Sequence, residues 1–65
     1  MWTTYWWIVD DENSDICGEE FFTELKDADR ARHTAYVRNL FPHDHVKCLG
    51  RVTMEEAEMM GLDTY

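Results

Sequence analysis

The sequence predicts a single α+β domain in which one long helix packs on a face of a three-stranded, mainly antiparallel sheet. Three observations support this prediction: an N-terminal run of strand-forming residues, a helical pattern that ends before the single proline, and a capping sequence that begins a second, short helix. A chain of 65 residues suffices for one hydrophobic core but not for two. The predicted order is β-β-α-β-α, and the predicted strand order in the sheet is 2-1-3.

Residues 2–9 are predicted to form the central strand. They include Trp, Thr, Tyr, Ile and Val, all of which favour strands, and neither glycine nor proline interrupts them. Alternation gives this strand two apolar or aromatic faces, one with Trp2, Thr4, Trp6 and Ile8 and the other with Thr3, Tyr5, Trp7 and Val9. A strand that is apolar on both faces is typical of the middle of a sheet with cover on each side.

A polar connection, residues 10–15, leads into a second predicted strand over residues 16–25. The two strands are expected to form an antiparallel hairpin with a loop of about six residues. Gly18 indicates a bulge or the true start of the second strand. Alternation assigns an inward direction to Cys17, Phe21, Thr23 and Leu25 and an outward direction to Glu20, Phe22 and Glu24.

A helix is predicted from Ala28 to about Leu40, with Asp27 as its N-cap. Small or apolar residues at three- and four-residue spacing define its expected inward face: Ala28, Ala31, Ala35, Tyr36, Asn39 and Leu40. The other faces receive Arg30, His33, Val37 and Arg38. Pro42 ends the helix, because the residue before a proline disfavours helical angles.

Alternation predicts a third, half-buried strand whose inward residues are Val46, Cys48, Gly50 and Val52. Thr53 and Glu56 match a capping box, which predicts a short helix over residues 54–60. Gly61 is expected at the left-handed position after this helix, with Leu62 packing back on it. The long helix returns the third strand parallel to the second. Docking beside the first strand therefore makes every neighbouring pair antiparallel.

Charge is distributed unevenly along a chain with 14 acidic and 6 basic residues and a formal net charge of −8. Residues 1–25 hold seven acids and no base, residues 26–51 hold all the bases against three acids, and residues 52–65 hold four acids. These charges either neutralise one another across the fold or form one acidic and one mildly basic side. An acidic surface repels phosphate and anionic lipid, which disfavours nucleic-acid and membrane binding.

The length of the apolar runs and the number of cysteines predict where in the cell the protein resides. No stretch approaches the length of a membrane span, and the N-terminus lacks the basic region of a signal peptide. Two cysteines, Cys17 and Cys48, are too few for a disulfide framework. We therefore expect a soluble, cytoplasmic protein with reduced thiols.

Residues that bind zinc in other proteins gather at His43, Asp44, His45 and Cys48, with Cys17 elsewhere. Their spacing matches no zinc framework, and a polar loop with two small thiols is the simpler interpretation. Asp11, Asn13 and Asp15 resemble the start of a calcium loop. The sixth and twelfth positions of that loop are Ile16 and Phe22, where glycine and glutamate are required, so we expect a solvated hairpin loop and no metal or cofactor.

The sequence contains no catalytic motif. Cys48 next to a histidine is a conceivable nucleophile, but alternation places this thiol inside, and a reactive thiol must be accessible. Ser14 lacks a Gly-x-Ser-x-Gly context. Without a nucleophile, a base and an oxyanion-binding group, we expect a protein that is not an enzyme.

The aromatic residues of the sheet favour a binding function. One long helix cannot cover both faces of a sheet whose central strand carries tryptophan on each. We therefore expect Trp2, Trp6 and Phe22 to form a surface that binds a partner protein or a second copy of the chain. For Met54, Met59 and Met60 the favoured interpretation is that they fill the second face of the core, and the alternative is that they extend this surface.

Two other functions remain open. The acidic N-terminal segment is a candidate mimic of nucleic acid that binds a DNA- or RNA-binding protein. The sheet is a candidate stacking platform for single-stranded nucleic acid, formed by Trp2, Trp6 and Phe22 or by Tyr5 and Trp7, with charge from Lys47 and Arg51. The net charge and the glutamates beside Phe22 argue against this platform.

Overall fold

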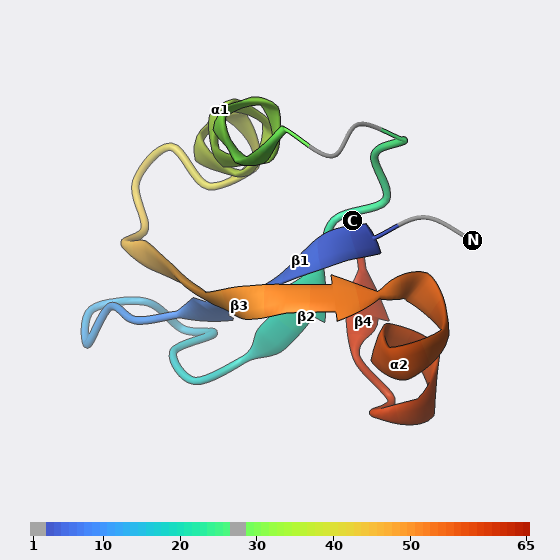
Figure 1. Ribbon diagram of the computed structural model, residues 1–65. Helices are drawn as coiled ribbons and strands as arrows, with labels where there is room; N and C mark the ends of the chain where they lie inside the picture. Colours follow the sequence, from blue (N-terminus) through green and yellow to red (C-terminus); the bar gives the residue numbers. More distant parts are fainter. Residues whose placement is uncertain (1–2, 27–28) are drawn as a thin grey trace.

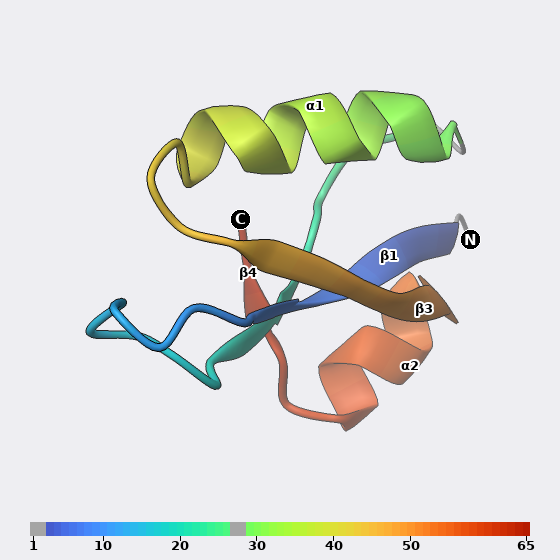
Figure 2. The ribbon, with the colours of Figure 1, turned by 90° about the vertical axis from the view of Figure 1, so that its left-hand side faces the viewer.

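The computed structural model describes residues 3–26 and 29–65, which form a mixed four-stranded sheet with a helix on each side (Figure 1). The elements, in chain order, are β1 (Thr3–Val9), β2 (Glu20–Phe22), α1 (Arg30–Leu40), β3 (Val46–Thr53), α2 (Met54–Met59) and β4 (Asp63–Thr64). The strand order is β3-β1-β2-β4. Figure 2 shows α1 above the sheet and α2 below it. The α+β class and the central position of the first strand are confirmed.

The fourth strand corrects the prediction of three strands. β1 pairs antiparallel with both β2 and β3, as expected, but β4 pairs parallel with β2. The chain reaches this edge because α2 crosses the lower face of the sheet from β3 (Figure 2). The backbone N–H of Tyr65 then donates to the carbonyl of Phe22 at 3.1 Å, and that of Glu24 donates to the carbonyl of Tyr65 at 2.9 Å.

A β-bulge in β3 changes the face of the sheet to which its side chains point. Trp7 lies opposite Cys48 and Trp6 lies opposite Gly50, which leaves Leu49 without a partner in β1. One extra residue reverses the alternation of a strand. Val46 and Cys48 therefore pack against the core below α1, whereas Gly50 and Val52 lie on the α2 side. The prediction that all four share one inward face is wrong.

The hairpin between β1 and β2 has a longer loop than predicted, because β2 begins only at Glu20. Residues 16–19 form turns, in which the N–H of Gly18 donates to the carbonyl of Val9 at 2.8 Å. Gly18 has a φ of +88°, a left-handed conformation that favours glycine. This turn leaves Cys17 exposed, which corrects its predicted inward direction.

The main core lies between α1 and the upper face of the sheet. Its buried members are Tyr5, Trp7, Val9, Phe21 and Val37. α1 begins after Asp29, whose carboxylate accepts the N–H of Ala31 at 2.9 Å, and it ends at Leu40, with Phe41 as its C-cap before the proline. Asp29 therefore replaces the predicted cap Asp27, which, like Ala28, lies outside the described residues.

The face of α1 that packs on the sheet differs from the predicted one. The buried residues of α1 are His33 and Val37, whereas Ala31, Ala35, Asn39 and Leu40 are exposed and Tyr36 is half-buried. His33, Val37 and the C-cap Phe41 recur every four residues and bury more area than an alanine stripe does. The larger side chains therefore determine the orientation of α1.

Candidate functional site

The residues predicted to form a binding surface have different environments. Trp6 is half-buried, and its indole N–H donates to Glu20 Oε1 at 2.9 Å. Phe22 lies opposite Trp6 in the sheet but is only 4% exposed, which corrects its predicted outward direction. It belongs to the face that α2 crosses, and β4 pairs beside it. Trp2 lies outside the described residues.

The exposed apolar residues of this side lie on α2 instead. Met59 is 83% exposed and Met60 is 47% exposed, so the prediction that these two side chains fill the core is wrong. Ala57 is the buried residue of α2, and Met54 is half-buried. We define the Met–Glu surface as the exposed residues of this helix and its C-cap: Glu55, Glu56, Glu58, Met59 and Met60.

The local sequence holds α2 in place at both ends. The Thr53 hydroxyl accepts the N–H of Glu56 at 3.0 Å, and the Glu56 carboxylate accepts the N–H of Thr53 at 3.2 Å, which confirms the capping box. At the other end, Gly61 has a φ of +71° and the N–H of Leu62 donates to the carbonyl of Ala57 at 3.2 Å. These bonds form the predicted left-handed C-terminal cap.

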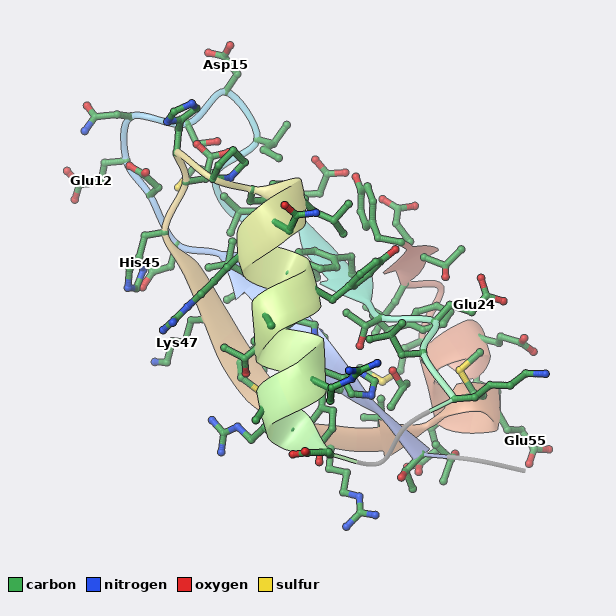
Figure 3. The ribbon with its side chains drawn as sticks, turned by 90° about the horizontal axis from the view of Figure 1, so that it is seen from above. Glu12, Asp15, Glu24, His45, Lys47 and Glu55 are labelled. Carbon is green, nitrogen blue, oxygen red and sulfur yellow. The ribbon has the colours of Figure 1, made fainter. Side chains whose placement is uncertain are left out.

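The charges of the molecule segregate in space. The basic residues of residues 26–40 lie on α1 and the segment before it, above the sheet, whereas the Met–Glu surface carries three acids below the sheet. A second acidic region is the loop at the tip of the hairpin. Figure 3 shows Glu12 and Asp15 at this end of the molecule, and Glu24 and Glu55 at the opposite end. The acids of the N-terminal segment are therefore spread over both ends.

A buried polar chain connects the sheet to α1, and the sequence pattern did not reveal it. Thr4, Thr23 and His33 are each 0% exposed. The Thr4 hydroxyl donates to the carbonyl of Thr23, and the Thr23 hydroxyl shares a hydrogen bond with His33 Nδ1. A hydroxyl next to an imidazole resembles an activated nucleophile, but its burial closes it to any substrate.

Asp11 ties the hairpin loop to the start of β3. Its Oδ1 accepts the N–H of Asn13 at 3.0 Å, and its Oδ2 accepts the N–H of His45 at 3.2 Å. The N–H of Asp10 also donates to the carbonyl of His45 at 2.8 Å. Both carboxylate oxygens of Asp11 are therefore engaged, which explains the Asp-x-Asn pattern as a turn and a loop anchor.

The predicted metal-capable residues do not form a cluster within the described part of the chain. His43 and His45 are exposed, while Asp44 and Cys48 are half-buried. No group of three or more His, Cys, Asp or Glu side chains in residues 3–26 and 29–65 is arranged to hold a metal ion. Among the same residues, no helix has the length and hydropathy that crossing a bilayer requires.

Comparison of the chain with models of protein families, with curated proteins and with solved structures gives no match.

Proposed function

We propose that this protein is a non-catalytic binding module whose Met–Glu surface contacts a positively charged partner protein. The observation that supports this proposal most directly is the exposure of Met59, 83%, on a helix that is otherwise acidic where it faces solvent. A helix in a domain this small gains stability by burying its methionines, and this helix leaves two of them in water.

The composition of the surface indicates the chemistry of its partner. Met59 follows Glu55 by four residues and Glu56 by three, so all three side chains share one face of α2. Methionine side chains adapt to irregular apolar partners. Glutamates around them attract basic groups and repel acidic ones. An amphipathic helix with an apolar face flanked by Lys or Arg satisfies both requirements.

The absence of catalysis is part of the proposal. In the described residues the one hydroxyl–imidazole pair, Thr23 with His33, is fully buried. The exposed thiol of Cys17 lies in the hairpin loop, and within the described residues it has no hydrogen bond to a histidine or a cation. These arrangements support a role in binding, since catalysis needs an accessible and activated group.

The two nucleic-acid hypotheses receive less support. Tyr5, Trp7 and Phe22 are buried, so their rings offer no stacking surface to a base. A mimic of nucleic acid needs a continuous row of carboxylates, whereas Glu12 and Glu24 lie at opposite ends of the molecule (Figure 3). Binding at the Met–Glu surface requires neither exposed stacking rings nor a continuous row of carboxylates.

A peptide titration tests the proposed function. The probe is a synthetic amphipathic helix of Leu and Lys, labelled with a fluorophore, and the readout is its anisotropy. Replacing both methionines, Met59→Ser with Met60→Ser, keeps every charge but removes the apolar contact. We expect this double variant to bind the peptide at least about tenfold more weakly than the wild type.

The matched control is the pair Leu40→Ser and Leu49→Ser, which removes two exposed leucines (38% each) outside the Met–Glu surface. We expect this control to bind within about twofold of the wild type, because these side chains are outside the contact. Equal binding by the methionine double variant refutes the proposal. Sedimentation that shows a dimer lost only in that variant assigns the surface to a second copy of the chain, which overturns the basic partner.

A further inference from the structure

A cavity of about 180 Å³ lies between the C-terminal half of α1, the loop that follows it and the upper face of the sheet. Its apolar walls come from Val37, Phe41 and Val46, and Trp7 also lines it. This volume corresponds to roughly six water molecules at about 30 Å³ each. It is below the roughly 300 Å³ of sites for drug-sized ligands, so the cavity admits only a small molecule.

Trp7 brings an unused hydrogen-bond donor to this part of the core. Trp7 is 3% exposed. Its indole Nε1 is buried and has no hydrogen-bond partner among the described residues. Buried donors in folded proteins nearly always have a partner. The Trp7 ring lines the cavity, but its N–H has almost no accessible surface, so the donor is not open to a ligand in this space.

Two opposite charges line the same cavity without pairing with each other. The guanidinium of Arg38 comes from the last turn of α1, and the carboxylate of Asp44 comes from the loop after Pro42. Within the described residues, no nitrogen of Arg38 lies within 4.0 Å of a carboxylate oxygen of Asp44. The cavity thus offers one group that binds an anion and one that binds a cation.

His45 is a further polar residue of the cavity lining. Its Nδ1 lies 3.2 Å from the carbonyl oxygen of Asp10. A carbonyl oxygen only accepts, so Nδ1 is the donor in this contact. His45 and Asp44 both line the cavity.

We propose that this cavity binds a small zwitterion, an α-amino acid with an apolar side chain. Arg38 receives the carboxylate of the ligand, and the Trp7 ring lies in the same cavity wall. The Asp44 carboxylate accepts hydrogen bonds from its ammonium group. The side chain of the ligand packs on the apolar walls. A simple anion leaves Asp44 unmatched and a simple cation leaves Arg38 unmatched, whereas a zwitterion matches both.

Titration of the unmodified protein with L-leucine tests this proposal. The readout is the ¹H–¹⁵N signal of the Trp7 indole, identified by elimination with the variants Trp2→Phe and Trp6→Phe. We expect leucine to shift this signal to saturation. Leucine amide lacks the carboxylate and 4-methylpentanoate lacks the ammonium group, and we expect each to bind at least about tenfold more weakly, since each loses a charge-assisted contact.

Two results of this titration overturn the proposal. One is the absence of any saturable shift of the Trp7 signal up to about 20 mM leucine, a concentration above the millimolar Kd of weak ligands. The other is binding of 4-methylpentanoate as tight as that of leucine, which identifies a plain carboxylate site. Both results are measured on the wild-type chain, and the two tryptophan variants serve only to assign the signal.

Single substitutions then assign the groups. Asp44→Asn removes a charge at constant size, and Arg38→Gln replaces the cation by a shorter neutral polar side chain. We expect each to weaken leucine binding about tenfold. The matched control is Arg30→Gln, in the first turn of the same helix and outside the cavity lining, which we expect to bind leucine as the wild type does. Equal loss in Arg30→Gln contradicts the assignment of Arg38.

Discussion

At the scale of single residues, His33 is the side chain that fixes α1 over the sheet. It is fully buried, it shares a hydrogen bond with the Thr23 hydroxyl, and its ring lies edge-on to Tyr5 with ring centroids 4.8 Å apart. Tyr5 is in the central strand, and Thr23 follows β2 directly. One imidazole therefore connects the helix to two strands through both polar and aromatic contacts.

Replacing this residue, His33→Ala, tests its role. We expect the free energy of unfolding to fall by about 2–4 kcal/mol, because the change leaves a cavity and removes one of the hydrogen-bond partners of the buried Thr23 hydroxyl. Urea denaturation followed by circular dichroism measures this loss. His43→Ala is the matched control, since His43 is exposed, and it should change stability by less than about 0.5 kcal/mol. Equal stability of the two variants contradicts the role of His33.

The sequence pattern of α1 pointed to the wrong face for a physical reason. The alanines at 31 and 35 have the spacing of an inward face, but methyl groups contribute little burial energy. His33 appears polar in sequence, and its burial becomes favourable only when Thr23, ten residues earlier, supplies a hydrogen bond. That partner belongs to tertiary structure and has no signature within the helix.

At the scale of elements, α2 is the best-defined piece of the chain. The capping box at Thr53 and the left-handed Gly61 lie on either side of only six helical residues. A helix this short is unstable alone, so the caps and the packing of Ala57, which is 0% exposed, must hold it. Met59 and Met60 lie at the C-terminal end of this capped helix and are exposed.

Removing the N-cap, Thr53→Ala, tests this dependence. We expect a loss of about 0.5–2 kcal/mol in the free energy of unfolding, because the N–H of Glu56 loses its acceptor. Thr53→Ser is the control that keeps the hydroxyl, and it should retain most of the stability. Amide hydrogen exchange should show faster exchange in α2 and β4 of the alanine variant. Unchanged exchange in both elements refutes the dependence on this cap.

Elements specified by local residues were predictable, and elements that depend on distant partners were not. The first strand, the proline-ended helix and the capped helix each have their signals within a few residues. β4 has two residues, and its hydrogen bonds exist only because β2 lies beside it. The bulge at Leu49 likewise appears only when β3 pairs with β1, and it reassigns Gly50 and Val52 to the opposite face.

At the scale of the whole molecule, the two helices divide the faces of the sheet unequally. α1 closes the upper face over Tyr5, Trp7 and Phe21. The lower face receives the six-residue α2, and on this face Phe22 is buried whereas Trp6 is half-buried. The prediction that one face of the sheet lacks cover was based on Trp6 and Trp7, which point to opposite faces of β1. The side chains exposed there, Met59 and Met60, were expected in the core, because nothing in the helical pattern distinguishes a buried methionine from an exposed one.

The most direct test of the central claim measures how accessible the methionine methyl groups are, before and after a partner binds. The protein is labelled with ¹³C at the methionine methyl groups, and a soluble paramagnetic agent is added. We expect strong broadening of the Met59 and Met60 signals and weaker broadening of the signal of the half-buried Met54. Binding of the basic amphipathic peptide should protect Met59 and Met60. Their protection in the free protein, or their continued broadening in the complex, contradicts the claim that this surface is the binding site.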